Sequence, residues 1–245
     1  MEWKHLISLV LLALARRGDK DVIEGLQPHS NANKLSIEGY QGLGFPWLDF
    51  SILPNLVKIS LIEHIEHLPL LERLPLLKTL RICALNSVKA IDCIGVVAGF
   101  PSLEELKLDG MPNLEEWSPL KDNGAEELPC LGSLIIRNCP RLIRFPSLSP
   151  LVHPVLWGCN IEMVLRSMRN RSYLEPLDIG HFKDLVNFPD GLLQSLISLR
   201  RLNIMSCNQL KTLPMEVAQN SLTSLSIQDC SNLLNLSDIK LLSRI

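Results

Sequence analysis

Two groups of side chains in this sequence could perform chemistry: the cysteines and one short stretch rich in histidine. The chain contains seven cysteines. No two of them form a C-x-x-C pair, the spacing typical of zinc and dithiol redox sites. Four share one position, eight residues after the first apolar residue of a repeated motif: Cys139, Cys159, Cys207 and Cys230. We interpret these four as small, buried, reduced thiols that close the end of a strand, with disulfides between neighbouring repeats as the less favoured alternative.

The densest group of potential metal ligands is Glu63-His64-Ile65-Glu66-His67. Two histidines three residues apart can share a metal ion on a helix, but this stretch follows a strand motif and has no further ligand set nearby. We interpret it as a solvated loop and predict no metal. The sequence also lacks the G-x-S-x-G and H-E-x-x-H motifs of serine hydrolases and zinc proteases. We therefore predict a protein that is not an enzyme and needs no cofactor.

The elements that position these residues follow from an L-x-x-L-x-[LI] motif. It occurs ten times at intervals of 20 to 28 residues, beginning at Leu6, Ala32, Leu56, Leu77, Leu103, Leu131, Leu151, Leu174, Leu199 and Leu222. This period is typical of leucine-rich repeats. One such repeat cannot bury its own apolar face, so it must stack on its neighbours. The sequence therefore predicts an α/β leucine-rich-repeat solenoid with a parallel sheet on the concave face and a mostly irregular convex side with short helical turns.

Alternation within each motif predicts which side chains face the core. In the sixth repeat, Leu131, Leu134 and Ile136 point inward, whereas Ser133, Ile135 and Arg137 point outward. The same register places a mixed set of basic, acidic and apolar residues on the concave face, including the tryptophan, arginine and methionine types that protein interfaces favour. The candidate protein-binding residues are Lys34, Lys58, Arg81, Lys107, Arg137, Trp157, Asp178, Arg201, Asn203 and Met205.

The segments between the motifs are less regular. A second pattern of Cys or Phe, then an apolar residue after three and again after six positions, predicts how the chain returns from the sheet. We expect Met111 and Trp117 to pack on the rim, and 116–127 to form a polar loop. Short helical turns are expected within 21–25, 161–169, 191–196 and 216–219. Pro154 replaces a core leucine and removes a ladder donor, so the sheet should be weakest around 151–157.

The two ends and the net charge limit the remaining classes of function. Residues 1–15 fit either a first repeat strand, which we favour, or a signal peptide with Ala13 and Ala15 before the cleavage site. Their apolar run is too short to span a bilayer. The formal net charge of −2 does not favour a nucleic acid as partner. We expect neither nucleic acid nor membrane to be bound.

Several strings in this order carry a resemblance to a known family. They are GLQPHSNANKLSIEGYQGLGFP (25–46), LPNLVKISL (53–61), LPLLERLPLLKTLRI (68–82), FPSLEELKLDGMPNLEEW (100–117) and the later C-x-x-L-x-x-[LF]-P segments. Together they resemble the leucine-rich-repeat region of plant intracellular immune receptors of the nucleotide-binding, coiled-coil class. The chain departs from that pattern at His64 and His67, where cysteines are common, and at Leu70 and Glu72, where proline and glycine are usual.

The resemblance implies that residues 1–245 form one leucine-rich-repeat domain of about ten repeats. Such a domain would lack the nucleotide-binding and coiled-coil domains and a clear C-terminal cap. The sequence contains no Gly-Lys pair and so no phosphate-binding loop. The implied function is protein binding in the cytoplasm during defence. The partner would be a pathogen effector, a guarded host protein or a receptor's nucleotide-binding domain. A secreted ligand-binding or inhibitor protein and a nonfunctional receptor remnant are the alternatives.

Overall fold

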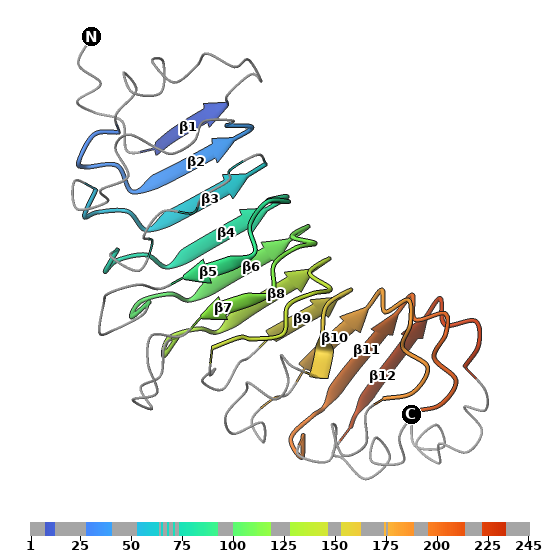
Figure 1. Ribbon diagram of the computed structural model, residues 1–245. Helices are drawn as coiled ribbons and strands as arrows, with labels where there is room; N and C mark the ends of the chain where they lie inside the picture. The colour runs from blue at the N-terminus through green and yellow to red at the C-terminus, as the bar shows by residue number, and fades with distance from the viewer. Residues whose placement is uncertain are drawn as a thin grey trace.

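A single curved parallel sheet dominates the computed structural model (Figure 1). The model describes residues 8–12, 28–40, 53–63, 65, 68, 71, 74–92, 100–118, 128–146, 153–162, 174, 176–188, 196–213 and 222–233. The ten strands of the sheet are β1 (Ser8–Leu12), β2 (Lys34–Glu38), β3 (Lys58–Ile62), β4 (Thr79–Cys83), β6 (Glu105–Asp109), β8 (Ser133–Arg137), β9 (His153–Trp157), β10 (Pro176–Gly180), β11 (Arg201–Met205) and β12 (Ser224–Gln228). Each strand pairs with the strand of the next repeat, which confirms the predicted leucine-rich-repeat solenoid.

The leucines of successive strands lie in register, one above the other. Leu106 is the cross-strand partner of Leu134, and Leu202 is the partner of both Leu177 and Leu225. Alternation explains this, because the second and fourth residues of each strand face the core while the first, third and fifth face outward. In β3, β4, β6 and β8 both inward residues are buried. The predicted inward and outward assignment is therefore confirmed for these strands.

Pro154 occupies an inward position of β9 without breaking the strand. All five residues of β9 pair with β8, but only three pairs join β9 to β10. In a parallel ladder the N–H groups of alternate residues point to opposite neighbours. The His153 N–H donates to the Gly132 carbonyl on the β8 side, so the donor missing at Pro154 falls on the β10 side. That the sheet is weakest around 151–157 stays a prediction, and the shorter pairing of β9 with β10 is the place to test it.

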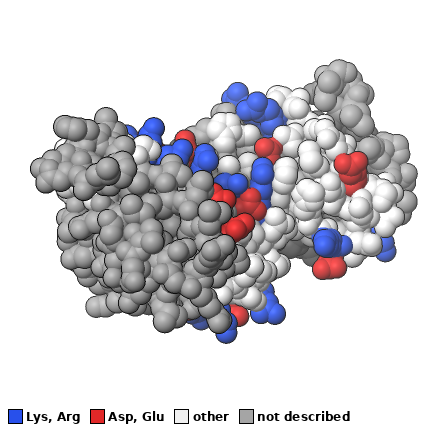
Figure 2. All heavy atoms as spheres, turned by 90° about the horizontal axis from the view of Figure 1, so that it is seen from above, with Lys and Arg blue, Asp and Glu red and all other residues white. Residues whose placement is uncertain are grey.

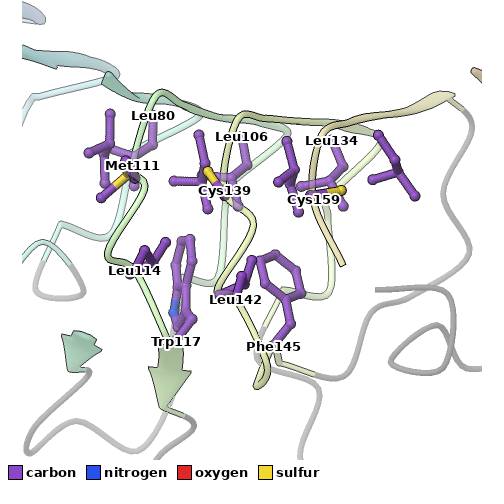
Figure 3. Packing of buried hydrophobic residues seen from close by; sticks show 14 of the residues in the cluster. Leu80, Leu106, Met111, Leu114, Trp117, Leu134, Cys139, Leu142, Phe145 and Cys159 are labelled. Carbon is purple, nitrogen blue, oxygen red and sulfur yellow. The ribbon is translucent and has the colours of Figure 1, made fainter. Parts of the chain in front are cut away.

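A second file of buried residues begins two positions after each strand. Its members include Met111, Cys139 and Cys159. Leu114 and Trp117 lie below Met111, and Leu142 and Phe145 lie below Cys139 (Figure 3). Met111 and Trp117 are only 0% and 1% exposed, so the prediction that they lie on the rim was wrong. Trp117 packs edge-on between Phe100 and Phe145, with ring centroids 5.7 Å apart on each side. These three rings connect successive repeats on the side of the core away from the main sheet.

The side opposite the main sheet carries a small second sheet. Strands β5 (Ala90–Asp92) and β7 (Glu116–Ser118) pair in parallel, and an isolated bridge joins Glu116 to Arg144 in the following repeat. The first residues of the expected 116–127 loop are therefore a strand, and 119–127 lie outside the described residues. Of the expected helical turns, 161–162 begin a helix, whereas 21–25, 216–219 and nearly all of 191–196 lie outside the described part of the chain.

One conformation recurs directly after nine strands, from β2 to β12. The residue that follows each of them has a positive φ: glycine at Gly39, Gly110 and Gly158, and other types at Glu63, Ala84, Asn138, His181, Ser206 and Asp229. In the eight that precede Asp229, its N–H donates to the carbonyl of the last strand residue of the next repeat, as from Ala84 to Asp109 at 2.8 Å and from Gly110 to Arg137 at 3.0 Å. This left-handed position turns the chain away from the sheet and adds one hydrogen bond between repeats.

Candidate interaction surface

The outward side of the main sheet, which we call the open face, carries three columns of side chains from the first, third and fifth strand residues. All ten residues predicted from the sequence lie on it. Lys34, Lys58 and Arg201 stand in the first column, Arg81, Lys107, Asp178 and Asn203 in the middle column, and Arg137, Trp157 and Met205 in the third. Their role in binding stays a prediction, whereas their placement follows from the strand register.

Three side chains of the third column and its edge form a stack. The Arg137 guanidinium carbon lies 4.2 Å from the centroid of the Trp157 ring. The Trp157 ring in turn lies 5.1 Å from that of His181, at an interplanar angle of 50°. Arg137 and Trp157 are cross-strand partners, and His181 follows β10 directly. Cation–π contact of this kind is worth about 0.5–2 kcal/mol, depending on how well water is excluded.

Gly180 lies between the tryptophan and the next strand. A Cβ atom at Gly180 would stand 2.8 Å from the Met205 carbonyl oxygen and 3.4 Å from Trp157 Cδ1. A separation below 3.0 Å from a backbone atom forces the chain to shift. The missing side chain therefore lets β10 and β11 approach closely, whereas a Cβ atom would make only an ordinary contact with the indole. His181 was not among the predicted residues, because it follows the strand motif rather than belonging to it.

The carboxylate nearest to Arg137 along the sheet is already occupied. Asp109 is the cross-strand partner of Arg137. Its Oδ2 atom accepts an ion pair from Lys107 Nζ at 3.1 Å, and its Oδ1 atom accepts a hydrogen bond from Asn138 Nδ2 at 3.3 Å. No ion pair joins Arg137 to any residue that the structure describes. Its positive charge is therefore balanced by the tryptophan face rather than by a carboxylate.

Two nitrogen atoms of this stack are buried without an acceptor. They are Arg137 Nε and Trp157 Nε1, neither of which has a hydrogen-bond partner among the described residues. Such an unsatisfied donor typically costs about 1–3 kcal/mol. By contrast, polar groups further along the face are paired: Asp178 accepts a hydrogen bond from the Asn203 amide of the next strand. The stack is the part of the open face with unused donors.

A groove opens beside the stack, where the chain leaves β8, β9 and β10. It has a volume of about 590 Å³ and is lined by Pro112, Asn138, Pro140, Gly158, Cys159, Asn160, Ile161, Glu162, His181, Phe182, Lys183, Asp184 and Leu185. Most of this lining is apolar. Sequence reasoning missed the groove, because it is built from three post-strand segments that differ in length and composition. The one available signal for the groove was the presence of proline or phenylalanine just after two of those strands.

The four cysteines of the repeated motif form no reactive site in the described part of the chain. Cys139, Cys159 and Cys207 are buried free thiols, Cys230 is half-buried and also free, and these findings confirm the predicted structural role. The Cys139 thiol donates to the Arg137 carbonyl at 3.2 Å, and the Cys230 thiol donates to the Gln228 carbonyl at 3.3 Å. Burial raises the pKa of Cys139 to about 11 and also raises that of Cys159. A thiol that stays protonated is a poor nucleophile and metal ligand.

The described residues form neither a metal site nor a helix that could span a membrane. His64, Glu66 and His67 of the histidine-rich stretch lie outside the described residues. Across the residues with described positions, no three His, Cys, Asp or Glu side chains gather as metal ligands would. Within the same ranges, no helix has the length and apolar character needed to cross a bilayer.

Comparison with known proteins agrees with the fold and with the resemblance. Residues 3–85 match the family model for R13L1/DRL21 leucine-rich repeats. The chain is 32% identical over 206 residues to the putative disease resistance protein RGA1 of Solanum bulbocastanum, which covers 82% of this chain and 21% of that protein. It is 30% identical over 239 residues to the putative disease resistance RPP13-like protein 1 of Arabidopsis thaliana, covering 89% of this chain and 22% of that protein.

The chain thus spans about a fifth of the length of these relatives. Among solved structures, the leucine-rich repeat domain of the type III effector XopL superposes with a TM-score of 0.53 at 20% identity, over 93% of this chain and 70% of that one. This likeness supports the fold alone. With the register of the sheet and the sequence matches in agreement, the chain is a leucine-rich-repeat solenoid that resembles the repeat region of plant disease resistance proteins.

Proposed function

We propose that the chain is a protein-binding module of plant defence that contacts its partner through the open face. The partner would be a pathogen effector, a guarded host protein or the nucleotide-binding domain of a receptor, and the setting would be the cytoplasm. The observation that carries the proposal is that each strand separates core-forming side chains from surface side chains. Two side chains hold the core, and three stand on a surface that no described segment covers.

The chemistry of that surface favours binding over catalysis. Its polar groups engage one another, as in the Lys107–Asp109–Asn138 cluster. On the face seen in Figure 2, basic and acidic side chains lie interleaved in small groups, without a continuous basic stripe. A nucleic acid would require such a stripe. A mixed surface with exposed arginines and a half-buried tryptophan suits a protein partner.

The test is capture from plant extract by wild-type protein and two charge-reversed variants. Arg81→Glu with Arg201→Glu alters two exposed side chains of the open face. Arg141→Glu with Lys211→Glu makes the same charge change on exposed residues outside the sheet. Captured proteins are identified by mass spectrometry, and the affinity of each purified candidate is measured by calorimetry.

We expect the open-face variant to bind at least about tenfold more weakly, a change of about 1.4 kcal/mol. The control variant should bind like wild type. Equal affinity of all three proteins, at unchanged thermal midpoints, would show that the partner uses another surface.

A further inference from the structure

We infer that the Arg137–Trp157–His181 stack and the adjoining groove bind a short peptide segment of the partner, one that presents a carboxylate beside a bulky apolar side chain. The inference rests on the proposed function, because it specifies what the open face recognises. It draws on two separate features: the charge state of the stack and the shape and composition of the groove.

The charge around the stack calls for an anion. Arg137 carries a full positive charge at neutral pH, since the guanidinium group does not deprotonate in proteins. The Asp109 carboxylate beside it is engaged on both oxygens, by Lys107 and by Asn138. Arg81 lies next to Lys107 on the adjacent strand and adds a further positive charge. An incoming carboxylate therefore meets a net positive neighbourhood and need not displace an existing ion pair.

The stack also holds the guanidinium in a fixed orientation. Its plane is supported by the indole 4.2 Å away, and the indole is supported by His181. A guanidinium held in one orientation loses less side-chain entropy on binding, and its parallel N–H donors match the two oxygens of a carboxylate. Arg137 Nε and Trp157 Nε1 are themselves buried, so an incoming carboxylate would pair with the outer guanidinium N–H groups. A carboxylate is the protein group that supplies the most acceptor sites to such donors.

The groove begins where the stack ends. Asn138 follows Arg137, Gly158 follows Trp157, and His181 belongs to both. A volume of about 590 Å³ falls within the range of about 300–1,000 Å³ usual for ligand pockets. Its apolar walls include Pro140, Ile161 and Phe182.

Charged side chains in the groove lining set the order of the two groups in the peptide. They are Glu162, Lys183 and Asp184, two acids and one base. A second acidic group in the groove would be disfavoured by this balance. The carboxylate is thus expected at the stack, and the apolar side chain in the groove.

The probe is a phage-displayed library of random 12-residue peptides, selected in parallel on wild-type protein and on Arg137→Gln. Arg137→Gln removes the positive charge and the paired N–H donors of the guanidinium group while keeping a polar side chain. Arg144→Gln makes the same substitution on an exposed arginine outside the main sheet and is the matched control. Thermal unfolding confirms that each variant is folded. The affinity of one enriched, fluorescently labelled peptide is then measured by polarisation for every protein.

We expect wild type and Arg144→Gln to enrich Asp or Glu within about three residues of Leu, Ile, Phe or Trp, the distance over which an extended peptide spans about 10 Å. Arg137→Gln should lose this enrichment and bind the chosen peptide at least tenfold more weakly. Leu185→Ser, in the groove wall, should lose the apolar preference but keep the acidic one. If Arg137→Gln does not fold, His181→Ala removes an exposed part of both the stack and the groove, and it should weaken the same peptide.

Three outcomes would overturn the inference. They are enrichment of peptides without acidic residues, equal affinity of Arg137→Gln and wild type, and no enrichment at all. None of the three affects the proposed function, which is measured separately with whole proteins and with Arg81→Glu and Arg201→Glu. Conversely, if all three whole proteins bind the partner equally while the peptide results hold, the peptide site is supported and the proposed function is not.

Discussion

The left-handed position after each strand makes a sharp prediction for two adjacent repeats. Gly110 has φ +66°, and Ala84, in the repeat before it, has φ 57°. A Cβ atom at Gly110 would have its nearest neighbours, both backbone atoms of Ala84, at 3.6 Å, an ordinary contact distance. Gly110→Ala therefore creates no clash, and its effect comes from backbone conformation alone. Ala84→Gly is the reverse change in an equivalent setting.

The two effects should have opposite signs. A non-glycine residue in the left-handed region costs about 1–2 kcal/mol, and glycine loses about 0.5–1 kcal/mol more backbone entropy on folding than alanine. Gly110→Ala should thus destabilise by about 1 kcal/mol, which lowers the melting temperature of a chain of this size by about 2–4 °C. Ala84→Gly gains the same difference but loses part of a half-buried methyl group, so it should stabilise by about 0.5 kcal/mol.

Gly132→Ala is the matched control for these measurements. Gly132 does not have a left-handed φ, and a Cβ there would approach only the Glu104 carbonyl oxygen, at 4.0 Å. Reduced entropy of the unfolded chain should make this substitution stabilising by about 0.4–1 kcal/mol. Thermal unfolding followed by circular dichroism compares all three variants with wild type. If Gly110→Ala and Gly132→Ala shift the melting temperature alike, the left-handed conformation at Gly110 does not affect stability, and this prediction is wrong.

Three further predictions concern the core, one thiol and the weak point of the sheet. Trp117→Ala should destabilise by about 3–5 kcal/mol, because it empties a fully buried site between Phe100 and Phe145; urea unfolding measures this, and a loss below 1 kcal/mol would contradict the packing. Burial raises the pKa of the Cys139 thiol from 9.0 to about 11. The unfolded state therefore loses this proton first, and stability should fall by about 2 kcal/mol as the pH rises from 9 to 11. Cys139→Ala should lack this component of the pH dependence, and an identical pH dependence in both proteins would contradict the assigned burial. Pro154→Leu restores a ladder donor facing β10 and should stabilise by about 1 kcal/mol, with slower hydrogen exchange in β10; faster exchange there would show that the proline fits its site better than leucine.

The sequence was sufficient to predict the main sheet and the face of each outward residue. The L-x-x-L-x-[LI] motif fixes alternation, so one correct register assigns every strand position, including Arg137 and Trp157. Their neighbourhood across β8 and β9 follows because each lies six residues after the first apolar residue of its motif. The stack itself did not follow, because it depends on Asp109 being engaged by other groups and on the placement of His181, which lies outside the motif.

The sequence was less informative about the rest of each repeat. Trp117 was assigned to the rim because no strand motif includes it, whereas the structure buries it among aromatic rings of neighbouring repeats. The strands β5 and β7 have three residues each, too few for an alternation to stand out. The left-handed position was hidden because six residue types other than glycine fill it. Hydrogen bonding between repeats, rather than local preference, stabilises that conformation.

The separation of inward from outward side chains within each strand has an evolutionary consequence. Substitutions at the first, third and fifth strand positions alter the open face while the leucine files beneath remain intact. New specificities can therefore accumulate one residue at a time, with little thermodynamic penalty to offset. Exchange of whole repeats by recombination would likewise preserve the ladder, because every unit presents the same edges to its neighbours. A lineage exposed to changing molecular targets could diversify this surface faster than one whose recognition residues also support the interior.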